Sequence, residues 1–160
     1  SPVSAFEIIA GKIIPYLIFG IIASTLVLLF SILLFDITIK GSILWLYLII
    51  FLFIVGALGM GLFVSAISES TQVAFMIATF STMLPTFLLS GFIFPVKNMP
   101  VVLQIISYIV PAKYFIFALR TLLLKGAGIE AFWEQVLFLI FFAFLMFSLS
   151  TIKFVRGRIK

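Results

Sequence analysis

Three long stretches of this chain contain no charged side chain, and their length decides what the chain can fold into. They are residues 13–35, 42–67 and 73–94. A helix rises about 1.5 Å per residue, so each stretch can cross the roughly 30 Å hydrocarbon core of a bilayer. A fourth apolar run, residues 131–152, has Trp133 near its start and basic residues beyond its end. The sequence therefore predicts four transmembrane helices, the third kinked at Pro85.

The composition supports lipid as the main surroundings. Hydrophobic residues make up 65% of the chain and charged residues 9%, too few to cover a soluble fold of this size. The net charge of +5 is spread along the chain rather than gathered into a nucleic-acid surface, so no nucleic-acid partner is expected. Its densest cluster flanks the fourth run, as at a membrane surface: Lys153, Arg156, Arg158 and Lys160.

The segment 95–128 has a different pattern, because Pro100 and Pro111 divide it into pieces too short to span a bilayer. Burying Lys113 and Arg120 in hydrocarbon would cost about 2.5–3.5 kcal/mol each. A re-entrant or interfacial helical hairpin keeps these charges near the interface. The predicted fold is an all-α integral membrane protein with four transmembrane helices and this hairpin before the last span.

The topology follows from the number of crossings. Four crossings place both ends of the chain on one side, and the C-terminal basic cluster together with Lys12 favours the cytoplasm. The opening Ser-Pro-Val-Ser has neither a methionine nor a basic-then-apolar leader. We therefore expect a single transmembrane domain, residues 1–160, that is a fragment of a longer protein.

The absent residue types argue against several functions. Without cysteine or histidine, the chain lacks thiolate metal ligands and the usual general base. Ion-coupled carriers and intramembrane enzymes generally place charged or catalytic groups within the membrane, but the first three spans carry no charged residue. We expect no catalytic residue, metal site or cofactor in this chain.

Small residues in the second run mark one face of the predicted helix. Ala57, Gly61 and Ser65 recur at four-residue spacing, which favours close helix packing. This contact is either static packing, the commoner case, or a sliding contact in a gate.

Two polar segments flank the spans on the side predicted to be cytoplasmic. The loop containing Ser68, Glu69 and Ser70 either grips a partner or simply caps the next helix through Ser70 or Thr71. The segment 4–12, which includes Glu7 and Lys12, fits both a membrane-surface helix and an ordinary helix start.

Read in order, several motifs resemble the ABC-2 permease family, in the branch of bacterial multidrug-type exporters. Their joint order and spacing carry the resemblance, which covers nearly the whole chain. The most specific motif is Leu89–Pro95, followed by Asn98–Pro100. The others are Pro2–Glu7, Gly11–Tyr16, Gly59–Leu62, Ser65–Ser68, Pro111–Phe115, Ala118–Arg120 and Lys125–Gly126.

The resemblance implies a permease of six helices, of which this chain would hold the second, third, fourth and sixth, with the hairpin as the fifth element. It also implies a separate cytoplasmic ATPase, which would hold ATP and magnesium, and a second permease subunit, identical or different. The candidate contacts with the ATPase are Glu7, Lys12, Ser68, Glu69 and Ser70. The candidate outer gate in the hairpin comprises Phe94, Pro95, Pro111, Tyr114 and Arg120, although Tyr and Arg also favour the interface as simple anchors.

The leading functional hypothesis is a permease subunit of the bacterial inner membrane that exports an amphipathic, drug-like or lipid-like substrate. No phosphate-binding loop occurs in the chain, so hydrolysis would belong to the partner. The alternative is a membrane anchoring or assembly subunit that transports nothing. A lipid-modifying enzyme would need catalytic groups from a missing N-terminal part.

Overall fold

The computed structural model of the chain describes residues 4–158, and every regular element in that part is helical. Lys160 of the basic cluster, and Pro2 and Val3 of the opening motif, lie outside the described residues. Within residues 4–158, four helical units are long and apolar enough to cross a membrane, which confirms the predicted fold class. The elements are α1 Ala5–Phe35, α2 Ile43–Ile67, α3 Thr71–Ala78, a π turn η1 Thr79–Met83, α4 Leu84–Leu89, η2 Val96–Asn98, α5 Val101–Ser107, α6 Pro111–Lys125, η3 Ile129–Ala131 and α7 Trp133–Arg158.

The first helix begins earlier than the predicted boundary at residue 13. Ser4 Oγ accepts a hydrogen bond from Glu7 N at 3.2 Å, and Glu7 Oε2 accepts one from Ser4 N at 2.9 Å. This reciprocal capping box satisfies free amide groups at the helix start. Of the two interpretations of segment 4–12, the structure supports the helix start, because the segment continues directly into α1.

The third span differs from its predicted limits at both ends, 71–89 rather than 73–94. Ser70 Oγ accepts a hydrogen bond from Val73 N and caps the helix start, while Gly91, at a φ of 79°, follows its end. A left-handed glycine just past a helix ends the hydrogen-bond ladder, so Phe94 lies in the loop beyond it. A π turn, η1, lies one turn before Pro85, where the missing amide donor of the proline interrupts the regular hydrogen-bond spacing. The kink predicted at Pro85 stays a prediction.

The limits of the last span also differ from the predicted 131–152. Residues 129–131 form the separate turn η3, and α7 continues past the predicted end at residue 152 as far as Arg158. The basic residues Lys153 and Arg156 are therefore part of the last helix. Cations near a helix C-terminus are favoured by the helix dipole, so they extend the helix rather than end it.

The packed core lies between α2 and α7, with α6 covering one side of it. Two glycines let α2 and α7 approach closely: a Cβ on Gly56 would lie 3.0 Å from Phe142, and one on Gly59 would lie 3.1 Å from Met146 Cβ. The core residues are Leu46, Ile49 and Ile50 on α2, Ala118 and Leu122 on α6, Val136 and Leu139 on α7, and Phe132 just before α7.

The predicted small-residue face does not make this contact. Ala57, Gly61 and Ser65 are exposed, and nothing lies within 4 Å of a Cβ built on Gly61. Each helical residue turns about 100° from the previous one, so the Gly56–Gly59 face points elsewhere. The α2–α7 contact uses the Gly56–Gly59 face because large side chains of α7 fill the space that these two glycines leave.

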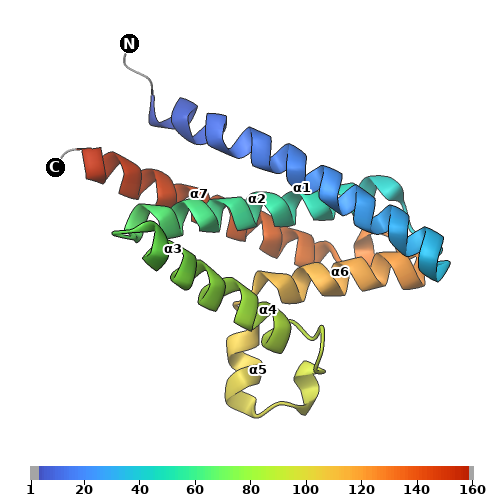
Figure 1. Cartoon of the computed structure of the whole chain (residues 1–160). Coiled ribbons are helices and arrows are strands. Elements are labelled where there is room, and N and C mark those ends of the chain that lie inside the picture. The colour runs from blue at the N-terminus through green and yellow to red at the C-terminus, as the bar shows by residue number, and fades with distance from the viewer. Residues whose placement is uncertain (1–3, 159–160) are drawn as a thin grey trace.

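The two ends of the bundle carry different connections, as Figure 1 shows. The start of α1, the α2–α3 turn and the end of α7 lie together at one end, here called the terminal end. The loop 36–42 and the end of α6 lie together at the other, here called the loop end, where Lys40 N donates to Leu123 O at 3.4 Å. Helices α5 and α6 form the hairpin, bent by 80° at the elbow between Ser107 and Pro111.

Candidate functional site

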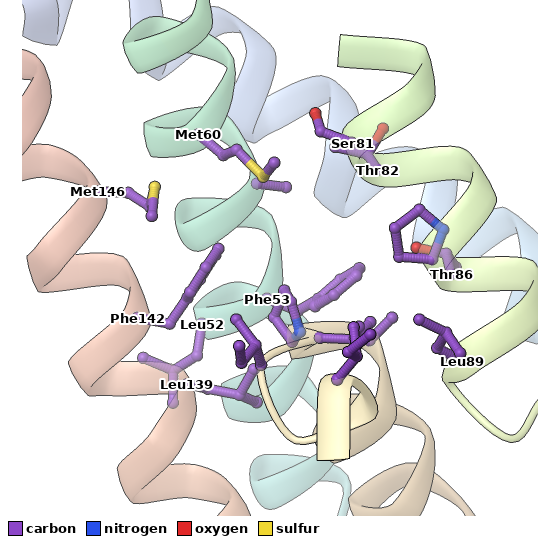
Figure 2. A pocket seen from close by; sticks show the side chains of 17 residues that line it. Leu52, Phe53, Met60, Ser81, Thr82, Thr86, Leu89, Leu139, Phe142 and Met146 are labelled. Carbon is purple, nitrogen blue, oxygen red and sulfur yellow. The ribbon is translucent and has the colours of Figure 1, made fainter. Parts of the chain in front are cut away.

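An apolar cavity of about 350 Å³ lies between α2, the η1–α4 segment, the α5–α6 elbow and α7. Figure 2 shows Leu139, Phe142 and Met146 on α7 and Thr86 and Leu89 on α4 lining it from different sides. Helix α2 contributes Leu52, Phe53, Ala57 and Met60, and the elbow contributes Ile106, Ile109, Val110, Pro111 and Ala112. Four elements distant in sequence therefore build one enclosure.

The polar groups of the cavity are hydroxyls from the third span. They belong to Ser81, Thr82 and Thr86, and no charged residue of the described chain lines the cavity. Ser81 Oγ donates to Ile77 O and Thr82 Oγ1 donates to Ala78 O, each at 2.6 Å. Because the hydroxyls of Ser81 and Thr82 donate their protons to the helix backbone, they offer acceptor lone pairs to a molecule in the cavity.

The elbow is joined to α7 by aromatic contacts. The ring of Tyr114 stacks on Phe138 with centroids 3.8 Å apart, and its hydroxyl donates to Tyr108 O at 2.7 Å. Phe138 is in turn stacked near Phe142, which lines the cavity and packs on Gly56. A continuous set of contacts thus connects the hairpin with the α2–α7 core.

The five predicted gate residues lie in four places. Phe94 and Pro95 are exposed and line a second, more open hollow of about 500 Å³ between α4 and α5, whereas Pro111 lines the apolar cavity. Tyr114 packs on α7. Arg120 Nη1 donates to Gly91 O at 3.3 Å, which ties α6 to the turn after α4.

The five predicted ATPase contacts belong to the first turns of α1 and to the α2–α3 turn, two segments that lie at the terminal end (Figure 1). Glu7 completes the cap of α1, and Ser70 caps α3, as the capping alternative predicted. Ser68 Oγ donates to Val64 O at 2.7 Å at the end of α2. Lys12 and Glu69 are exposed, so their charged groups are available to a partner at this end.

Sequence reasoning missed the residues that connect distant helices. Phe138 and Phe142 were indistinguishable from other apolar residues of the last run, and Phe53 stacks on Phe115 at 4.3 Å without any local signal. Ser150 is fully buried and donates to Gly59 O at 3.1 Å, linking α7 to α2. Lone serines in apolar runs are a usable signal for such bonds.

Comparison with known proteins gives a consistent result. The sequence profile of the ABC-2 type transporter family matches residues 1–124. The chain is 37% identical over 150 residues to the probable multidrug ABC transporter permease YbhS of Escherichia coli, covering 94% of this chain and 40% of that protein. It is 34% identical over 136 residues to the probable multidrug ABC transporter permease YbhR of Escherichia coli, covering 85% of this chain and 37% of that protein.

A more distant relative is ABC transporter G family member 20 of Dictyostelium discoideum, 27% identical over 141 residues, which cover 88% of this chain and 19% of that protein. The chain thus spans about 40% of the length of the bacterial relatives. No solved structure matches it.

Proposed function

This chain belongs to the ABC-2 type transporter family, and from that membership we propose that it is part of the permease of an ATP-driven exporter. ATP and magnesium would bind to a separate cytoplasmic ATPase, and this chain would supply no cofactor site and no catalytic residue. Two permease subunits, identical or different, would enclose the route across a bacterial inner membrane.

The apolar cavity carries the proposal. Its walls are hydrophobic and aromatic, with three hydroxyl-bearing residues on one side. Such a lining suits an amphipathic, drug-like or lipid-like molecule whose apolar part fills the cavity while a polar group meets the hydroxyls. The multidrug names of the bacterial relatives agree with this class of substrate.

The two ends of the bundle would have different roles. The terminal end carries Glu7, Lys12 and the turn Ser68–Ser70 beside the basic end of α7, so we assign it to the cytoplasm and to ATPase docking. The hairpin would close the outer end of the route, with Phe94, Pro95, Pro111, Tyr114 and Arg120 as its gate. In this scheme the ATPase moves the helices at the terminal end, and the cavity changes shape.

A transport assay with matched variants of α2 tests the role of the cavity. Ala57 lines the cavity, whereas Gly61, one turn further on, faces open space, and both residues are exposed enough to accept a larger side chain. Ala57→Phe in the full-length protein should reduce efflux of a dye-like substrate from cells, and Gly61→Phe should not. Equal efflux by both variants at equal membrane levels would contradict a substrate route through the cavity.

Affinity purification separates the exporter from the alternative of an anchoring subunit. The full-length protein should co-purify with an ATPase, and Glu69→Arg should weaken this association by reversing an exposed charge at the terminal end. Glu130→Arg is the matched control, because Glu130 is an exposed acid near the loop end. A wild-type eluate without a bound ATPase or ATP hydrolysis would favour the anchoring subunit.

A further inference from the structure

The third-span wall of the apolar cavity carries hydroxyl groups whose protons are already in use. Ser81 Oγ donates to Ile77 O, and Thr82 Oγ1 donates to Ala78 O, each at 2.6 Å. A hydroxyl has one proton and two lone pairs, so both oxygens can still accept a hydrogen bond from a molecule in the cavity. This pair of side chains therefore suits a donor better than an acceptor.

Pro85 makes the same wall richer in acceptors. Proline has no amide proton, so the carbonyl of Ser81, four residues earlier, lacks its α-helical donor. Both residues line the cavity. Thr86, the remaining hydroxyl of this wall, can act as a donor or as an acceptor.

The elbow wall supplies few donors in return. The amides of Ile109 and Val110 donate to carbonyls of α5 at 3.1 and 3.2 Å. The next residue, Pro111, has no amide proton, which leaves Ala112 as the backbone donor at this turn. Acceptors therefore outnumber donors among the described groups that line the cavity.

The walls from α2 and α7 have a weak polarity of the same sign. Figure 2 shows Phe53 and Met60 on α2, and Phe142 and Met146 on α7, around the cavity. The face of an aromatic ring carries partial negative charge, and a thioether sulfur is a weak acceptor. The positive hydrogen of a donor is favoured against these walls as well.

The absence of charge limits the kind of donor. No charged residue of the described chain lines the cavity. Burying an ionised group without a counter-charge costs far more than burying a neutral polar group that finds a hydrogen-bond partner. A carboxylate or phosphate would in addition meet the lone pairs of Ser81 and Thr82. The polar group that fits this wall is an uncharged donor.

We propose that the cavity selects molecules whose polar end carries an uncharged O–H or N–H group, with Ser81 and Thr82 as the acceptors that determine this specificity. The inference rests on the proposed role of the cavity as a substrate site, and it narrows the substrate class. The donor of the substrate bonds to the hydroxyl oxygens, and its apolar part packs against α2 and α7.

Equilibrium binding to the purified full-length protein in mild detergent tests this specificity. The probes are two forms of one apolar fluorescent dye, an alcohol and its methyl ether, which keeps the oxygen but lacks the proton. Fluorescence anisotropy gives the Kd of each, and specific binding is the part that Ala57→Phe removes by filling the cavity. The double variant Ser81→Ala, Thr82→Val should lower the preference for the alcohol over the ether about fivefold, the factor expected for one neutral hydrogen bond.

Matched variants isolate the acceptor. Thr82→Ser keeps the hydroxyl and should keep the preference of the wild type. Thr151 Oγ1 donates to Phe147 O at 2.9 Å, the same four-residue pattern, but Thr151 is exposed outside the cavity. Thr151→Val should therefore leave the preference unchanged. Partition of each dye into micelles is the same for all variants, so the comparison between proteins reports the site. Thr82→Val alone serves if the double variant does not fold.

The outcomes separate this inference from the proposed function. An unchanged preference in the double variant, with binding that Ala57→Phe still removes, would overturn the inference alone. So would tighter specific binding of a carboxylate or ammonium form of the dye than of the alcohol. Binding that Ala57→Phe does not reduce, or no binding of any form, would contradict the cavity as a substrate site and the inference with it.

Discussion

The α2–α7 pair and the α3–η1–α4 segment form opposite walls of the apolar cavity, but they are supported very differently. In α2 and α7, 28% of the most apolar stretch is buried, whereas the Thr71–Leu89 segment has none of its most apolar stretch buried. Two glycines bring α2 close to α7, and a buried serine of α7 bonds to the α2 backbone. The third span is joined to α2 by a short turn at its start. Its contact with α6 comes only near its far end, at α4 and the turn that follows.

This difference has a consequence for how the cavity can change. Segments that are sparsely packed open at lower free energy than a close-packed core. We expect the α2–α7 pair to act as a fixed wall and the third span, with its π turn, as the wall that moves. Four pairs of substitutions test how the two walls are held, from the largest expected effect to the smallest.

The largest contrast is expected between Ile49→Ala on α2 and Leu84→Ala on α4. Ile49 is fully buried, and Leu84 is 46% exposed. In lipid or detergent the usual hydrophobic transfer term is small, so the cost comes from weaker van der Waals packing around the cavity that the substitution creates. Ile49→Ala should lower the free energy of unfolding by about 2 kcal/mol or more, and Leu84→Ala by less than about 0.5 kcal/mol. Unfolding of the purified protein in detergent measures both, and equal losses would mean that the third span is equally packed.

The second contrast compares two glycines of α2. A Cβ on Gly59 would already lie 3.1 Å from Met146 Cβ and 3.1 Å from the ring of Phe147, whereas one on Gly61 meets nothing within 4 Å. Gly59→Leu should force α2 and α7 apart and cost about 1–3 kcal/mol. Gly61→Leu should be neutral or slightly stabilising, because leucine favours a helix more than glycine does. Thermal unfolding, monitored by size-exclusion chromatography, distinguishes the two variants. An equal loss of stability in Gly61→Leu would mean that Gly61 packs against a helix, as the sequence predicted.

The third contrast concerns two serines of α7. Ser150 is fully buried and bonds across to Gly59 O, whereas Ser148 bonds to Phe144 O of its own helix at 2.8 Å. Hydrogen bonds between membrane helices contribute about 0.6 kcal/mol on average and up to about 1.7 kcal/mol. Ser150→Ala should therefore lower the free energy of unfolding by that amount, and Ser148→Ala should change it little. A loss in Ser148→Ala as large as in Ser150→Ala would show that the bond between α7 and α2 is not what Ser150 contributes.

Much of the fold could be predicted because lipid leaves the backbone few choices. A segment in hydrocarbon must satisfy every backbone polar group internally, so an uncharged run of sufficient length predicts a helix. The ends of the helices were less predictable, since they depend on single residues. The cap at Ser4 starts α1 before its apolar run, and Gly91 stops α4 while the apolar run continues to Phe94.

The site was harder to predict for a different reason. In a helix that is apolar all round, hydropathy does not say which face meets which neighbour. The choice of Ala57, Gly61 and Ser65 over the Gly56–Gly59 face is one result of this ambiguity. The stacking of Tyr114 on Phe138 is another, since it depends on how α6 lies against α7.

The smallest effect is expected at Arg120, whose hydrogen bond to Gly91 O ties the mobile wall to α6. Arg120 is exposed, so this bond competes with solvent and headgroups, and Arg120→Gln should change the free energy of unfolding by less than about 1 kcal/mol. Its local effect should be larger, because the turn after α4 is no longer tied to α6. Hydrogen exchange of the full-length protein should therefore speed up in residues 89–100 and stay unchanged in α2. Lys125→Gln is the matched control, a substitution of an exposed cation at the end of the same helix. If exchange in residues 89–100 is unaffected by Arg120→Gln, the turn is held by its own packing, and the mobile wall extends only to the end of α4.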